Sequence, residues 1–195
     1  MNIDQKLIAE CIDGSRKSQN ELYKLVYPYL MSICIRYTRN YDRAKENLNI
    51  GFFRILKYLK TYRVDEPFKP WIRRVMINTL LREYKKEKAH NLNLVYVEDY
   101  EDSEKYSEMN TIIGKIDSDQ IYRFIDSLPS STRQVFNLYI VDGYKHREIA
   151  EMMDFSEGTS KWHLNSAREK LKEMILNSNE KLNRTDIPKT SKAHE

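Results

Sequence analysis

Apolar residues recur at three- and four-residue steps along most of the chain, which is the spacing that gathers them on one face of an α-helix. Polar breaks such as Asp13-Gly14-Ser15 and Asp142-Gly143 separate these segments, and such residues commonly end helices. The pattern therefore predicts an all-α protein. Helices are expected over residues 4–12, 18–39, 41–60, 68–88, 129–141 and 146–153, and from residue 157 onward. Residues 116–127 are expected to start the second domain with the apolar contacts Ile121, Phe124 and Ile125.

The predicted helices fall into two groups, and a chain of 195 residues is long enough for two small domains. Residues 1–88 are expected to form an N-terminal helical bundle around one core. Residues 116–176 are expected to form a second domain that ends in a helix-turn-helix. Between them, residues 89–115 are expected to be an acidic flexible linker, because residues 98–108 hold six acidic side chains and one lysine. The polar tail over residues 177–195 is expected to be disordered.

The end of the second domain has the spacing of a DNA-binding helix-turn-helix. A short helix begins at His146, Asp154-Phe155 turns the chain, and the Ser156 hydroxyl can cap the next helix. The inward positions of that last helix are Leu164, Ala167 and Leu171. Its outward or adjacent positions are Lys161, Trp162, Asn165, Ser166 and Arg168. A merely solvated polar face is the alternative, since residues 146–173 hold five Lys/Arg against six Asp/Glu.

The predicted helix from residue 68 is the basic element of the chain. Residues 69–90 carry seven Lys/Arg against two Glu, with Trp71 and Tyr84 interleaved. Basic residues with aromatic neighbours can follow a nucleic-acid backbone and stack on exposed bases, although a basic helix face is often only solvated. Trp71 is expected to fill the core rather than to stack on a base.

The sequence has no arrangement typical of an enzyme or a metalloprotein. It has no glycine-rich phosphate loop, no Ser/His/Asp arrangement and no metal-ligand spacing among its four His and two Cys. We therefore expect no catalytic residue, no metal and no cofactor. The net charge is +4, no apolar run is long enough to span a membrane, and no signal segment is present. These features predict a cytoplasmic protein that does not insert into membranes, with Cys11 and Cys34 as reduced thiols.

Three segments of the second domain resemble the DNA-binding C-terminal domain of bacterial RNA polymerase sigma factors, most closely the extracytoplasmic-function (ECF) class of the sigma-70 family. They are LPSSTRQVF, EIA and SEGTSKWHLNSAREKL, within Asp126–Leu176. The segment FKPWIRRVMINTLLREYKK is similar to the promoter-melting helix of the same class. Its residues at matching positions are Trp71, Arg74, Asn78 and Thr79. The departures from the family pattern are Ser160 in place of Val, and His163 and Ser166 in place of Arg.

The resemblance implies a promoter-specificity subunit that joins core RNA polymerase and directs initiation at promoters with −35 and −10 elements. By this resemblance, the −35 element would be read by Lys161, Trp162, His163, Asn165, Ser166 and Arg168. Phosphates beside it would be held by Arg133, Lys145, His146 and Arg147. The −10 element would be bound by Tyr62, Arg63, Val64, Asp65, Arg73, Arg74, Asn78, Arg82, Lys85 and Lys86. In the family, the loop holding the first four of these accepts a base flipped out of the duplex. For Trp162, contact with a thymine methyl and packing on polymerase are both open.

The resemblance also implies partners, which are the β′ clamp and the β flap of core polymerase, promoter DNA and an anti-sigma factor. Many family members read D-x-x-Q-E-x-F on the helix that grips the β′ subunit, where this chain has ENLNIGF. Core binding is thus expected from Glu46, Asn49, Ile50 and Phe53. Asn49 is a shorter amide than Gln, and Ile50 replaces an acid. The Ile50 side chain could pack on the partner, or the partner's cation could be left unpaired.

Two other functions are compatible with the same residues. A helix-turn-helix transcription regulator would bind DNA without polymerase, but the basic helix from residue 68 argues against it. A degenerate sigma-like protein would bind polymerase or an anti-sigma factor without reading promoters. The altered Asn49-Ile50 segment and the nearly neutral second domain keep that alternative open.

Overall fold

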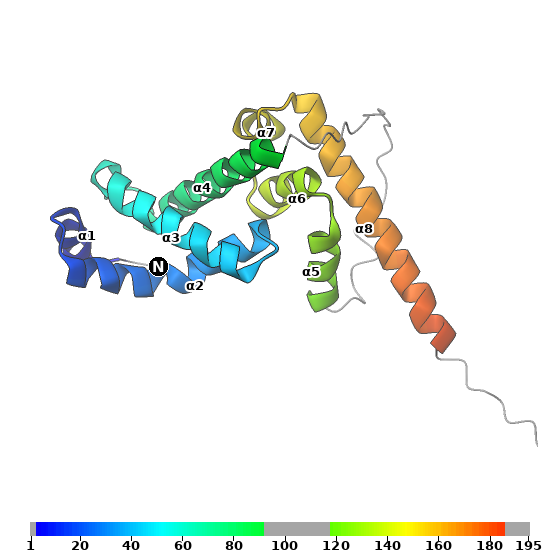
Figure 1. Cartoon of the computed structure of the whole chain (residues 1–195), viewed down its shortest axis with the longest axis horizontal. Helices are drawn as coiled ribbons and strands as arrows, with labels where there is room; N and C mark the ends of the chain where they lie inside the picture. The colour runs from blue at the N-terminus through cyan, green and yellow to red at the C-terminus, as the bar shows by residue number, and fades with distance from the viewer. Residues whose placement is uncertain (1–2, 92–117, 186–195) are drawn as a thin grey trace, which may run out of the picture. The chain divides into compact units, whose positions relative to one another are not determined.

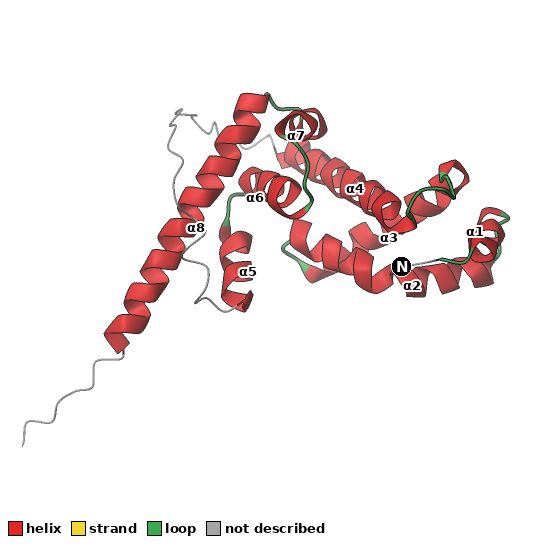
Figure 2. Ribbon diagram, turned by 180° about the vertical axis from the view of Figure 1, so that it is seen from behind, coloured by secondary structure: helices red, strands yellow, loops and turns green. Residues whose placement is uncertain are grey.

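The computed structural model describes residues 3–91 and 118–185 of the chain (Figure 1). Every regular element in these two ranges is helical, as Figure 2 shows, which confirms the all-α prediction. The elements are α1 (Gln5–Ile12), α2 (Arg16–Tyr37), α3 (Tyr41–Tyr58), the 3₁₀ turn η1 (Leu59–Thr61), α4 (Phe68–Asn91), α5 (Ser118–Ser127), α6 (Ser130–Phe136), the π-helical turn η3 (Asn137–Val141), α7 (His146–Met153) and α8 (Glu157–Thr185).

The helices form two compact units. One unit contains α1 to α4, and the other contains α5, α6, η3, α8 and most of α7. The predicted acidic linker, residues 89–115, begins within α4, and from residue 92 onward it lies outside the described residues. Among the helices that the structure describes, none has both the length and the apolar character needed to cross a membrane.

The core of the first unit lies where α2, α3 and α4 pack on one another, and α1 contacts α2 and η1. The largest fully buried side chains here are Leu22, Leu30, Ile33, Leu48, Ile55, Leu59, Ile72, Met76 and Ile77. Gly51 allows the close approach of α3 to α4, because a Cβ atom there would lie 2.4 Å from Cε of Met76. Removing one large side chain from such a core costs about 2–5 kcal/mol, so this packing holds α4 in place.

Side-chain caps fix where the first helices begin. The Asp4 carboxylate accepts a hydrogen bond from the backbone N–H of Lys6 at 2.9 Å and caps α1. The cap of α2 is Ser15, whose Oγ accepts from the backbone N–H of Ser18 at 3.3 Å. The prediction that α2 begins at Ser18 is therefore wrong by a few residues. Ser18 is buried, and its hydroxyl donates to Oε2 of Glu10 at 2.6 Å, which ties α2 to α1.

The second unit packs α5 and α6 against α8. Its buried side chains include Leu128, Val135, Phe136, Leu138, Ile149, Leu164, Ala167, Leu171 and Ile175. After α6 the helix continues as the wider π-helical turn η3, in which the backbone N–H of Asp142 donates to the carbonyl of Asn137 at 2.9 Å. Gly143 then ends the helix at the predicted stop, with a φ of +76° that L side chains rarely adopt.

α7 and α8 form the predicted helix-turn-helix, and Asp154 in the turn between them adopts a φ of +58°. Oγ of Ser156 accepts from the backbone N–H of Thr159 at 2.9 Å and caps α8, as predicted. The helix continues to Thr185, so the prediction of a disordered tail does not hold for residues 177–185, and residues 186–195 lie outside the described range. Two contacts join α8 to α5, between Met174 and Ser127 and between Ser178 and Gln120, and the second of them lies within residues 177–185.

Candidate nucleic-acid interface

α4 carries a polar stripe along the surface of the first unit. Arg74, Asn78 and Arg82 are exposed and follow one another at four-residue steps, so they lie along one line of the helix. The alternating positions Ile72 and Met76 are fully buried in the core and fix which side of α4 faces out. The stripe therefore offers two guanidinium groups and one amide to an anionic partner.

Ion pairs between α3 and α4 engage other cations of this unit. The Glu83 carboxylate accepts from Arg54 of α3 at 3.3 Å and from Lys86 at 3.1 Å. Arg43 of α3 pairs with Glu87 of α4. The remaining predicted DNA-binding residues of α4, Arg73 and Lys85, are half-buried. The charge of Lys86 is thus partly neutralised by Glu83.

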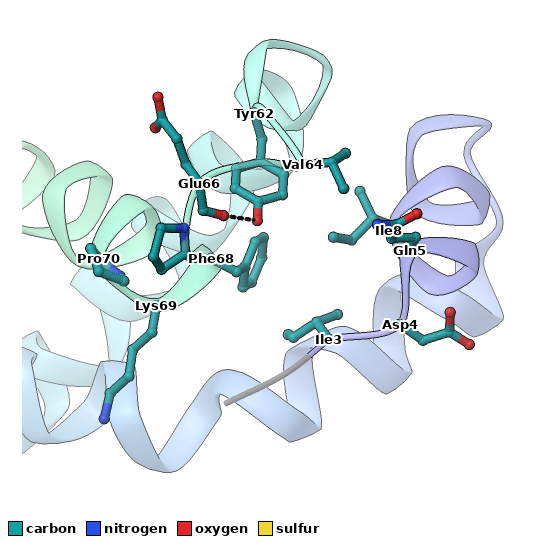
Figure 3. A pocket seen from close by; sticks show the side chains of 11 residues that line it. Ile3, Asp4, Gln5, Ile8, Tyr62, Val64, Glu66, Phe68, Lys69 and Pro70 are labelled. Carbon is teal, nitrogen blue, oxygen red and sulfur yellow. Dashed lines mark hydrogen bonds between the residues drawn. The ribbon is translucent and has the colours of Figure 1, made fainter.

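The loop between η1 and α4 is closed by aromatic contacts. The ring of Tyr62 lies edge-on to the ring of Phe68 at 5.1 Å and lies 5.3 Å from the ring of Trp71. The Tyr62 hydroxyl donates to the backbone carbonyl of Glu66 (Figure 3). Partial burial, with smaller effects of Glu66 and Asp65, raises the pKa of Tyr62, so the hydroxyl remains a donor. Trp71 is half-buried and packs on Tyr62 and Phe68, so it lies at the edge of the unit and does not fill its buried core as expected.

An open cleft of about 680 Å³ lies between this loop and the start of α1. Its apolar lining comes from Ile3, Ile8, Val64 and Phe68, which face the space between the two segments in Figure 3. The Lys69 side chain points away from the loop in the same view, and its ammonium lies 4.7 Å from the centroid of the Tyr29 ring. The exposed Arg63 and Asp65 at the loop tip pair with each other at 2.9 Å.

The outward face of α8 carries most of the residues predicted to read DNA. Lys161 is exposed. Half-buried beside it are Trp162, Asn165, Ser166 and Arg168. Lys145 and Arg147, at the start of α7, are exposed as well. Lys161, Asn165 and Ser166 therefore form a polar surface within two turns of α8.

His146 joins the first helix of the helix-turn-helix to the second. Its Nδ1 lies 3.0 Å from Oγ of the buried Ser160, and its ring stacks on Tyr139 at 4.5 Å. Burial, followed by the nearby charges of Lys161 and Arg168, lowers the pKa of His146, although Glu157 acts in the opposite direction.

The second unit is expected to lose stability as the pH falls from about 7.5 to about 5.5, because the unfolded chain binds a proton near the ordinary histidine pKa of about 6.5 and the folded His146 resists it. Thermal unfolding at both pH values tests this. A His146→Gln variant, whose amide can still bond Ser160, should lose less stability over this interval than the parent chain. Equal losses in the two proteins would contradict a role of His146.

Two residues predicted to contact DNA, His163 and Arg133, are buried instead, so both predictions are wrong. His163 is fully buried, and its Nδ1 lies 3.0 Å from Oγ1 of Thr132 in α6. Its ring also packs beside Phe155, at 5.2 Å between centroids. Arg133 is only 4% exposed, and its guanidinium points at the backbone carbonyl of Asp126 at 3.5 Å. Both side chains hold the second unit together, so neither can reach a groove or a phosphate.

Replacing His163 with alanine is expected to lower the free energy of unfolding by about 2–4 kcal/mol, since it leaves a cavity and removes the partner of Thr132. Urea unfolding followed by tryptophan fluorescence measures the change. Asn165→Ala, on the half-buried face of the same helix, is the control and should change stability by less than about 0.5 kcal/mol. Normal stability of His163→Ala together with lost DNA binding would restore the original prediction.

The outward face of α3 is rich in apolar and amide groups. Phe53 is 69% exposed and Ile50 is 38% exposed, and both lie beside the exposed Glu46 and Asn49. The hydroxyl of Tyr23, on α2, donates to Oδ1 of Asn49 at 3.0 Å. Residue spacing along a single helix could not predict this contact, because it joins two helices. Nor could it predict that α1 supplies part of the wall of the cleft.

Both cysteines are buried in the first unit. Cys34 is fully buried with its Sγ 3.6 Å from Sδ of Met76, and burial raises its pKa to about 12. Burial also raises the pKa of Cys11. Within residues 3–91 and 118–185, no group of three His, Cys, Asp or Glu side chains is placed to hold a metal ion.

Comparison with known proteins matches both units to one family. The Sigma-70 region 2 family matches residues 22–90, and the Sigma-70 region 4 family matches residues 118–171. The ECF RNA polymerase sigma-E factor of Salmonella typhimurium (strain 14028s) is 25% identical over 174 residues, covering 85% of this chain and 91% of the relative. The sigma-E factor of Haemophilus influenzae is 22% identical over 180 residues, which cover 88% of this chain and 95% of the relative.

The fold is similar to that of the sigma factor RpoE in complex with the anti-sigma factor NepR from Bartonella quintana. The TM-score is 0.51 and the sequence identity 18%, and the match covers 82% of this chain and 98% of the RpoE chain. The chain therefore belongs to the sigma-70 family, as a sigma factor of the ECF class.

Proposed function

We propose that this sigma factor binds core RNA polymerase through α3, opens the −10 element with α4 and the loop before it, and reads the −35 element with α8. The observation that carries the proposal is that each unit presents cations and an amide on one helix. These are the exposed Arg74, Asn78 and Arg82 on α4, and the exposed Lys161 with the half-buried Asn165 on α8. Two such helices, in separate units, fit two separate segments of one promoter.

At the −35 element, α8 would enter the major groove. Lys161 suits the acceptor edge of guanine or a phosphate, and Asn165 suits the paired donor and acceptor of adenine. Lys145 and Arg147, exposed at the start of α7, would hold phosphates and set the register. The nearly neutral helix-turn-helix is sufficient because polymerase, held by the other unit, keeps it at high local concentration.

At the −10 element, the stripe on α4 would bind phosphates while the loop over residues 62–67 holds an unpaired base. The cleft beside this loop supports the assignment, because its apolar lining of Ile3, Val64 and Phe68 can cover the faces of a base. Contacts with those faces would offset part of the cost of unstacking, which is a few kcal/mol.

The protein partners we propose are the β′ clamp, the β flap and an anti-sigma factor. The exposed Phe53 and Ile50 on α3 support the first of these, since both offer apolar surface that lacks a partner in the core. Family membership argues against a regulator that binds DNA without polymerase, because both regions of a sigma factor are present.

Run-off transcription with core polymerase on genomic promoter fragments tests the proposal and separates it from its rivals. The chain should direct specific transcripts, and Lys161→Ala should lower selectivity between matched and altered −35 elements by about tenfold. Gel-shift measurements without polymerase should detect little specific binding. Specific binding by the chain alone would favour an independent regulator, and binding to polymerase without any transcript would favour a degenerate sigma-like protein.

A further inference from the structure

The outward face of α3, proposed above to meet polymerase, is joined to α2 through the side chain of Tyr23. The Tyr23 hydroxyl donates to Oδ1 of Asn49 at 3.0 Å. The Tyr23 ring packs edge-on against Phe52, with centroids 4.9 Å apart and planes at 80°. Phe52 is itself buried in the core. Tyr23 is therefore held at both ends, by its ring on the core side and by its hydroxyl at the surface.

This contact determines how Asn49 presents its amide. An asparagine amide has one acceptor oxygen and two N–H donors, and its two ends exchange freely when the side chain is unconstrained. Because a hydroxyl already donates to Oδ1, the two N–H groups on Nδ2 remain for a partner. Partial burial raises the pKa of Tyr23, so its hydroxyl remains a donor near neutral pH.

The surroundings of Asn49 define the chemistry of the surface it would meet. Phe53 and Ile50 are exposed on the same face of α3. A complementary surface would place an oxygen acceptor, either a carboxylate or a carbonyl, against Asn49 and apolar side chains around that acceptor. Such contacts near the centre of an interface carry most of its affinity.

We propose that Tyr23 is a positioning residue for polymerase binding, which holds the Asn49 amide with its N–H groups outward toward an oxygen acceptor of the polymerase clamp that lies among apolar side chains. The inference rests on the proposed docking of α3. Pre-orienting a side chain raises affinity by removing the entropy cost of ordering it on binding.

A double-mutant cycle on the full chain tests the inference, with affinity for core polymerase measured by titration of fluorescently labelled protein. Tyr23→Phe keeps the ring and should weaken binding about fivefold to tenfold. Asn49→Ala should weaken it by a similar factor, and the double variant should bind no more weakly than Asn49→Ala alone. Asn49→Asp retains the acceptor for Tyr23 but removes the outward N–H groups, so it should also weaken binding.

The control is Ser32→Ala, which removes a hydroxyl with an intramolecular bond on the same helix, α2, and should leave core affinity unchanged. Unchanged affinity of Tyr23→Phe, or an equal loss from Tyr23→Phe in the Asn49→Ala background, would overturn the positioning role. Phe53→Asp distinguishes a failure of the proposed α3 docking from a failure of the Tyr23 role alone. If Phe53→Asp binds core normally, the proposed docking of α3 fails, and the role of Tyr23 fails with it. If Phe53→Asp loses binding but Tyr23→Phe does not, only the role of Tyr23 fails.

Discussion

Replacing Phe53 with aspartate is expected to weaken binding to core RNA polymerase by about a hundredfold. The Phe53 side chain is 69% exposed, so it contributes little to the core of its own unit. Buried at the centre of an interface, such a ring typically carries about 2 kcal/mol or more of the binding energy. A carboxylate at the same position adds the cost of removing a charge from water next to apolar groups.

The same variant should unfold at the temperature of the parent chain, because an exposed helical position tolerates polar residues. Leu25→Asp provides a matched control, since Leu25 is 52% exposed on α2 and does not lie on the α3 face. It introduces the same charge into the same unit and should leave core affinity within about twofold of the parent. Equal losses in the two variants would point to a general effect of charge, and no loss in Phe53→Asp would exclude α3 as the docking face.

Helical periodicity predicted most of this fold because nearly all of the core consists of apolar side chains at helical spacing. Leu164, Ala167 and Leu171 of α8 are all buried, as their spacing indicates. His163 belongs to the same inward side, four residues before Ala167, but its polar character made it resemble a surface residue. Its Nδ1 is hydrogen-bonded to Oγ1 of Thr132, and such a bond between helices leaves no periodic signal in the sequence.

For the candidate sites, the sequence likewise predicted which helical positions are exposed but not the contacts between helices. Arg74, Asn78 and Lys161 are exposed where the helical pattern places them. The Tyr23 contact with Asn49 and the cleft wall from Ile3 depend on how separate helices pack, so one-dimensional spacing could not reveal them. The early end predicted for α8 has a related cause, because α8 continues through a polar segment that local composition assigned to a tail. Within that segment Ser178 contacts Gln120 of α5, which helical spacing cannot reveal.

The second large effect is expected from the stripe on α4. The double variant Arg74→Ala/Arg82→Ala should lower the rate of promoter opening by about tenfold to a hundredfold. Both guanidinium groups belong to exposed residues that are eight residues apart along one helix line, with Asn78 midway between them. If each binds one phosphate, each releases about one counterion when the complex forms.

Salt dependence distinguishes phosphate contacts from a general loss of structure. The slope of log affinity against log salt concentration should fall by about two for Arg74→Ala/Arg82→Ala, because each lost phosphate contact removes about 0.9. Permanganate reactivity of unpaired thymines at the −10 element follows opening itself, and core binding should be unchanged. Lys17→Ala/Lys24→Ala removes two exposed charges from α2 and should preserve both the slope and the opening rate. A slope that stays at the parent value in Arg74→Ala/Arg82→Ala would mean that these side chains do not hold phosphates, whatever happens to the rate.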